Sequence, residues 1–202
     1  AASYANHCVT IVGWDDNYSK ENFGTYQPSS DGAWLIANNY GSDYGDDGYF
    51  WISYEEPTLT EFYSFKAASA STYDNAYQYD GFGWGNAISS GNTSTLAANI
   101  FTANTDYNQN LDSVGIYTIE DNQPYTISIY KNISGNVPTN GTLVETVSGT
   151  QAYNGYHAIT LDQSVSLNAG ETFSVVISYD KTSNVSGYIP IEGGSYDDGS
   201  TK

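Results

Sequence analysis

No stretch of ten or more residues in this chain carries the 3.6-residue apolar period of an amphipathic helix. Short apolar runs alternate instead with loops rich in Gly, Asp, Asn and Ser, residues that tolerate tight turns. In YTISIY (125–130), Tyr125, Ile127 and Ile129 would share one face of a strand. ETFSVVISY (171–179) repeats this period of two. Its inward positions would be Phe173, Val175, Ile177 and Tyr179. The chain is therefore expected to be mainly β.

A change in composition near residue 67, to small and polar residues, predicts two domains, 1–66 and 67–202. The first holds three apolar runs: HCVTIVGW (7–14), AWLIANN (33–39) and GYFWISY (48–54). The polar segment AASASTYDNA then suggests a hinge. In the second domain, strand-like runs and turns at short intervals are typical of an antiparallel β-sandwich. Its further expected strands are LDSVGIYTI (111–119), TLVETVS (142–148), YHAITL (156–161), VSL (165–167) and GYIPI (187–191). Pro190 predicts an edge strand, and the early end after it suggests a sandwich truncated at its C-terminus.

The charge of the chain excludes several partners. It has 23 acidic residues against five lysines and no arginine, for a net charge of −18. Nucleic-acid binding needs Lys and Arg to neutralise phosphates, so no nucleic-acid partner is expected. No apolar run is long enough to insert across a membrane. The abundance of Tyr, Asn, Ser, Thr and Gly, with few lysines, favours an extracellular β protein.

His7 and Cys8 stand side by side in NHCVTIVGWDD (6–16). Such a pair suggests a cysteine hydrolase, because an imidazole can turn a thiol into a nucleophilic thiolate. In a strand, however, neighbouring side chains point to opposite faces and cannot form the required hydrogen bond. Cys8, the only cysteine, is therefore expected to be a small buried residue. His7 would need a different partner.

A second motif supplies that partner. Asn38 lies near the end of AWLIANN, and Tyr40 and a glycine-rich stretch follow it. NHCVTIVGW and GAWLIANNYGSDYGDDGYFWISY together closely resemble the second half of the papain family of cysteine peptidases. The resemblance implies that His7 is the general base and that Asn38 orients its imidazole. Tyr40 would replace the Trp that usually shields this pair from water. Ala5 and Asn6 would lie beside the substrate cleft.

The chain also departs from the family pattern. Cys8, Ala37, Asn39, Tyr40 and Tyr44 stand where the family usually has Ala, Lys, Ser and two Trp. The family's nucleophilic Cys and oxyanion-hole Gln belong to a preceding half, and nothing like their QGxCGS/ACW motif occurs in this sequence. The chain alone is therefore expected to be inactive.

The resemblance implies the C-terminal part of a secreted or cell-surface endopeptidase that cleaves peptides or proteins by thiolate acyl transfer. The lack of any Met and the first residue, Ala, suggest a piece of a longer protein. Since the family's cleft lies between two halves, an apolar surface around His7 is expected. The N-terminal half, as a separate chain or a removed segment, is the expected partner there, with self-association as the alternative.

From about residue 75 the chain looks similar to the lectin-like sandwich of some bacterial surface peptidases, on ANIFTA, YTISIY and GETFSVVI. This resemblance suggests a glycan ligand. An exposed aromatic residue such as Trp84 could stack on a sugar ring, although aromatic residues in a sandwich are more often core. The alternative function is a non-catalytic surface adhesin, in which a dead peptidase scaffold presents a carbohydrate- or protein-binding module.

No metal or cofactor is expected. The acidic clusters at 15–16, 43–47 and 197–198 lack the D-x-D-x-D-G spacing of a calcium loop, and turns favour Asp in any case. His157 would share a face with Ile159 and Leu161, which indicates a core or edge histidine. The sequence also lacks a Ser nucleophile elbow, a P-loop and a dinucleotide fingerprint.

Overall fold

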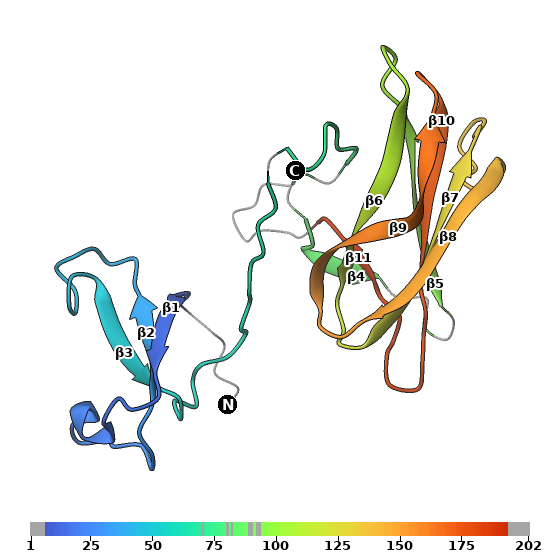
Figure 1. Cartoon of the computed structure of the whole chain (residues 1–202). Coiled ribbons are helices and arrows are strands. Elements are labelled where there is room, and N and C mark those ends of the chain that lie inside the picture. The colour runs from blue at the N-terminus through green and yellow to red at the C-terminus, as the bar shows by residue number, and fades with distance from the viewer. Residues whose placement is uncertain are drawn as a thin grey trace. The chain divides into compact units, whose positions relative to one another are not determined.

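The computed structural model of the chain describes residues 7–69, 71–79, 81, 83–88, 91 and 94–193. The chain divides into two compact units, Ala1–Thr72 and Tyr73–Lys202. The described residues form strands β1 to β11 and a single short 3-10 helix, η1, which confirms the mainly β class (Figure 1). None of the helices in these ranges has the length and apolarity that a membrane crossing needs.

The first unit is built on a three-stranded antiparallel sheet of order β1-β2-β3. Its strands are Thr10–Asp15, Ala33–Ala37 and Tyr49–Ser53. The helix η1 (Lys20–Phe23) lies in the connection between β1 and β2, and the Ser19 side chain caps it by accepting a hydrogen bond from the Glu21 amide. Since β1 is an edge strand, one of its sides has no strand partner among the described residues.

The core of the first unit is thin. Among its described apolar residues only Ala33 and Ile36 are buried, both on the central strand β2. On β1 every residue but one is exposed, and Trp14 is 68 % exposed. The sheet therefore has little to cover it within the described part of this unit.

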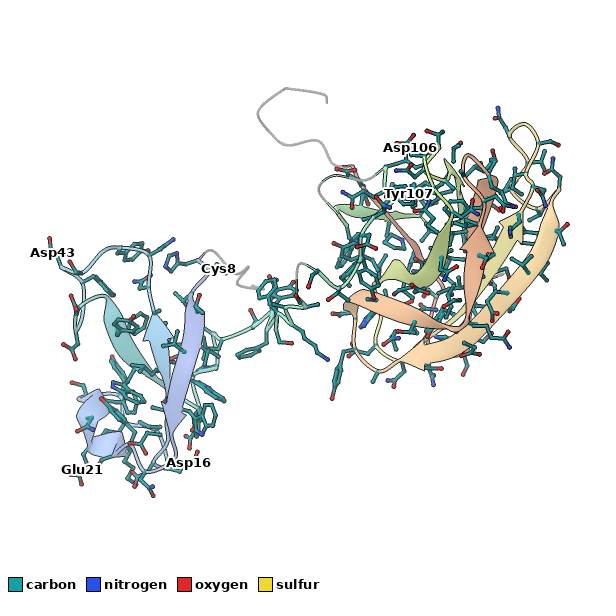
Figure 2. The ribbon with its side chains drawn as sticks, turned by 45° about the horizontal axis from the view of Figure 1, so that its top comes forward. Cys8, Asp16, Glu21, Asp43, Asp106 and Tyr107 are labelled. Carbon is teal, nitrogen blue, oxygen red and sulfur yellow. The ribbon has the colours of Figure 1, made fainter. Side chains whose placement is uncertain are left out.

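The prediction that Cys8 is buried is wrong. Strand β1 begins at Thr10, so His7 and Cys8 precede it and strand alternation does not govern them. Cys8 is exposed (Figure 2). The structure nevertheless gives no hydrogen bond between His7 and Cys8 in the described part of the chain.

The second unit is the predicted antiparallel β-sandwich. A four-stranded sheet of order β5-β10-β7-β8 packs against a two-stranded sheet of β6 and β9, and Figure 1 shows β9 crossing in front of the larger sheet. The bounds of these strands are Thr95–Thr102 for β5, Gln109–Thr118 for β6, Gln123–Lys131 for β7, Thr142–Gln151 for β8, Gly155–Leu167 for β9 and Thr172–Tyr179 for β10. Two short strands, β4 (Asn86–Ile88) and β11 (Ile189–Ile191), pair with each other.

The core lies between the two sheets. On β7, Tyr125, Ile127 and Ile129 are buried while the residues between them are half-buried, which confirms the predicted period of two. On β10, Ser174 and Val176 are buried as well as the predicted inward residues, except that Ile177 is only half-buried. Ser174 and Val176 lie on the face opposite Phe173 and Val175, and the Ser174 hydroxyl donates to the carbonyl of Pro138, so β10 is covered on both faces.

Two other expectations concern strand boundaries. YHAITL and VSL, expected as separate strands, belong to the single strand β9, with a register shift in its pairing with β6 between Leu111 and Ser113. The bulge absorbs the polar residues between the two runs, so the chain does not have to turn there. Pro190 lies in β11, whose strand partner in the described part is β4, and its predicted edge position is confirmed.

Candidate active site

His7 and Asn38 meet at one end of the small sheet. Strands β1 and β2 are antiparallel with Thr10 opposite Ala37, so the chain just before β1 lies beside the chain just after β2. His7 precedes β1 and Asn38 follows β2, which brings together two residues 31 positions apart. The imidazole Nε2 lies 2.8 Å from the Asn38 Oδ1.

A backbone amide sets the direction of this hydrogen bond. The Asn39 N–H also donates to the Asn38 Oδ1, over 2.9 Å. A donor on that atom requires it to be the amide oxygen, so His7 must donate its Nε2 proton to it. In the neutral imidazole, Nδ1 then keeps its lone pair and is the nitrogen able to take a proton. Asn38 thereby selects the tautomer of His7.

Tyr40 covers one face of the imidazole. The Tyr40 and His7 rings stack with centroids 4.7 Å apart and planes 22° apart. Tyr44 meets Tyr40 edge-on at 5.3 Å, and Phe50 of β3 meets Tyr44 edge-on at 6.0 Å. This aromatic chain links the stack to the sheet.

The pair is more open than the sequence suggested, because Tyr40 is itself 61 % exposed, His7 is exposed and Asn38 is half-buried. Among the described residues, ring stacking covers the imidazole on one side only.

A glycine-rich loop returns the chain from Asn38 to β3. The backbone N–H of Asn38 donates to the Gly48 carbonyl over 3.0 Å, which anchors the backbone at the site. Gly45 has a φ of +66°, and a side chain there would collide with the carbonyl of Tyr49. Only glycine fits this position without strain. The glycine spacing of the motif thus holds Asn38 in place.

A second polar cluster joins the β1–β2 connection to the end of β3. Glu55 accepts hydrogen bonds from the hydroxyls and backbone amides of Ser30 and Ser29, which lower its pKa to about 2. Tyr54 donates to Asp16 over 2.7 Å. Partial burial and this hydrogen bond raise the pKa of Tyr54 to about 12. Both contacts hold the framework of the sheet and lie outside the His7–Asn38 pair.

An open depression of about 560 Å³ lies along β3, the β1–β2 connection and the segment that follows β3. Phe23, Tyr26, Trp51 and Leu59 are among its lining residues, and neither His7 nor Asn38 is. The depression is therefore separate from the His7–Asn38 site.

The other predicted residues have these positions. Ala5, Asn6 and the acidic pair at 197–198 lie outside the described residues. Trp84 is 40 % exposed. His157 faces inward and its Nε2 contacts the Thr118 hydroxyl at 3.2 Å and the Tyr153 carbonyl at 3.0 Å. No group of three His, Cys, Asp or Glu side chains in the described ranges is arranged to hold a metal ion.

Two contributions to the site were missed from the sequence. Asn39 acts through its backbone N–H, which has no side-chain signature. Phe50 supports the aromatic chain from β3, where an aromatic residue is ordinary in any strand. The recurrence of aromatic residues after Asn38, at Tyr40, Tyr44 and Phe50, was the available signal.

Family comparisons agree with this geometry. The family described as papain family cysteine protease matches residues 1–72, and the lectin like domain family matches residues 76–201. The chain belongs to the lectin-like domain family over residues 76–201, and its residues 1–72 are similar to the papain family of cysteine proteases. Both resemblances expected from the sequence, to the papain family and to a lectin-like sandwich, are confirmed.

Two solved structures are similar to this chain. The clostridial cysteine protease Cwp84 after propeptide cleavage is 36 % identical, with a TM-score of 0.67, over 92 % of this chain and 45 % of that chain. The cysteine protease and lectin-like domains of Cwp84, a surface layer associated protein of Clostridium difficile, are 34 % identical, with a TM-score of 0.62, over 92 % of this chain and 40 % of that chain. The chain thus spans less than half of either structure. A comparison with curated proteins gave no match.

Proposed function

We propose that this chain is the His/Asn part of a secreted or cell-surface endopeptidase that hydrolyses peptide bonds by thiolate acyl transfer. The observation that carries the proposal is the hydrogen bond from the His7 Nε2 to the Asn38 Oδ1 beneath the stacked ring of Tyr40. A base held in one tautomer by a partner on its other nitrogen is what an activated nucleophile requires.

In this mechanism the His7 Nδ1 takes the proton of a cysteine thiol and later gives a proton to the leaving amine. The thiolate attacks the peptide carbonyl and forms an acyl-enzyme. Water then hydrolyses the acyl-enzyme and frees the thiol. Asn38 carries no charge, so the imidazolium keeps the thiolate as its dominant ionic partner. Tyr40 keeps water from one side of the His7–Asn38 hydrogen bond.

The nucleophilic cysteine and an oxyanion donor would come from the N-terminal half of the peptidase, outside this chain. The exposed apolar residues Ile11, Val12 and Trp14 of edge strand β1, which follow His7, support a partner at this surface. On this proposal the chain alone is inactive, and it cleaves a peptide or protein only together with that half.

A surface or extracellular location fits the similarity to Cwp84, a surface layer associated protein. It also fits a chain of net charge −18, which would stay soluble outside the cell and avoid anionic membranes.

A thiol-directed active-site probe tests the proposal in the full-length parent protein. The parent should be labelled, and His7→Ala should abolish the labelling because the thiol is no longer activated. Both proteins carry Cys8→Ser, because Cys8 is an exposed thiol that the probe can reach. This background substitution should leave active-site labelling unchanged, since Cys8 has no hydrogen bond to His7 in the described structure.

Labelling that survives His7→Ala would remove the assignment of the base. A parent that is never labelled would favour the adhesin with a dead peptidase scaffold.

A further inference from the structure

The β6–β9 sheet has one face in the sandwich core and one face toward solvent. Val114, Ile116, Ile159 and Leu161 point into the core. Because side chains alternate along a strand, the residues between them form the opposite face. The cross-strand pairs of that outer face are Ser113 with Thr160, Gly115 with Ala158, and Tyr117 with Tyr156.

Tyr156 lies flat on this outer face. A β-carbon at Gly115 would collide with the Tyr156 Oη and lie 3.0 Å from its Cε2 and Cζ, so the ring crosses the sheet above the glycine. Tyr156 is 61 % exposed, and the Tyr117 ring braces it at 5.1 Å with a tilt of 58°. Tyr117 is itself confined, because a side chain at Gly83 would collide with its hydroxyl. A rigid aromatic surface therefore faces solvent.

The chemistry of this face selects its ligand. None of these six residues is charged, and the exposed Asp162 follows two positions beyond Thr160 on the same face of β9. The flat ring offers a negative π face to weakly positive C–H groups, and the rim offers the hydroxyls of Thr160 and Tyr156. A neutral pyranose ring, with C–H groups on its faces and hydroxyls at its edge, matches both features.

We propose that the outer face of β6 and β9 binds a neutral oligosaccharide, with one sugar ring stacked on Tyr156. Thr160 lies four residues along β9 from Tyr156, or about 13 Å in an extended strand, which exceeds one sugar ring and suits an oligosaccharide. The site does not involve His7 or Asn38, so it stands or falls separately from the peptidase mechanism. It also differs from the earlier expectation for Trp84, which is less exposed than Tyr156 and lies outside β6 and β9.

Isothermal titration calorimetry of the whole chain with cellohexaose and with chitohexaose tests the site. At least one probe should bind saturably. Tyr156→Ala should weaken that binding by about tenfold or more, because the stacking surface is lost, while Tyr156→Trp should keep it. Tyr26→Ala is the matched control and should bind as the unchanged chain does, since Tyr26 is 92 % exposed in the other unit.

A surface residue such as Tyr156 can be replaced without loss of the fold, and an unchanged melting temperature of Tyr156→Ala should verify this. Failure of both sugars to bind, or binding that Tyr156→Ala leaves intact, would overturn the proposal. Neither result would bear on labelling of the catalytic thiol, so the two proposals fail separately.

Discussion

The two units of this chain differ in how much core each one builds. In the described residues the sandwich buries apolar side chains from both of its sheets, while the three-stranded sheet buries only Ala33 and Ile36. Yet the three-stranded sheet carries the His7–Asn38 pair. Hydrogen bonds, glycine turns and ring stacking thus assemble the pair without a substantial core around it.

The physical reason lies in the layers. A sheet is stabilised when one of its faces is buried against another layer, and the sandwich supplies both layers from its own strands. The first unit has one sheet and one short helix in its described part. We therefore expect its stability to depend on the N-terminal peptidase half that we propose as its partner.

The largest effect should appear when the units are separated. Residues 73–202 should fold alone and melt cooperatively, because both of their packed sheets contribute buried apolar side chains to one core. Residues 1–72 should lack a cooperative melt, because so little apolar surface is buried. Near-UV circular dichroism and calorimetry of the two fragments would check this. A sharp melt of residues 1–72 would break the contrast between the units.

Truncation of a core residue in the sandwich comes next. Ile127→Ala should lower the free energy of unfolding of this unit by about 2 to 5 kcal/mol, since Ile127 is completely buried and its loss leaves a cavity. Leu96→Ala, at a residue 66 % exposed in the same sheet, should change it by less than about 0.5 kcal/mol. Urea unfolding of both variants measures the difference, and equal losses would contradict it.

Substitutions at the His7–Asn38 pair of the first unit should change the catalytic activity of the parent. In the full-length parent, Asn38→Ala should lower kcat/KM by roughly 10²-fold, because His7 loses the partner that fixes its tautomer and orientation. Asn39→Ala should have little effect, because Asn39 contributes its backbone N–H, which alanine retains. Steady-state kinetics on one peptide substrate would compare them. Equal losses would mean that the Asn39 side chain also has a role.

The smallest expected effect is a pH dependence of folding stability that is confined to the first unit. The pKa of Glu55 is lowered from 4.5 to about 2, so its hydrogen bonds stabilise the folded state fully above pH 4.5. This contribution is lost as the pH falls from about 4.5 through about 2, because protonation then occurs in both states. Near-UV circular dichroism of the parent across this range should show it.

Glu55→Gln is the control for this prediction. Gln keeps an accepting oxygen toward Ser29 and Ser30 but has no carboxyl group to protonate, so the acid-dependent step should disappear. If the variant keeps the same step, another carboxylate must cause it.

Much of this architecture could be predicted from local patterns. The alternation at Tyr125, Ile127 and Ile129 was sufficient for β7, because the period of two follows from strand geometry alone. The pairing of His7 with Asn38 was also predictable, since two motifs with fixed glycine spacing imply one arrangement of the strands. Their chemical roles stay a prediction.

Other features depended on neighbours that are distant in the chain. Cys8 was expected inside, but its exposure depends on what packs over an edge strand, and a strand's own sequence does not specify its cover. Tyr156 lies flat because Gly115 is diagonal to it across the register of β6 and β9. Periodicity within a segment reveals which face a residue occupies, whereas burial and ring orientation are set by contacts between segments, which only the tertiary structure brings together.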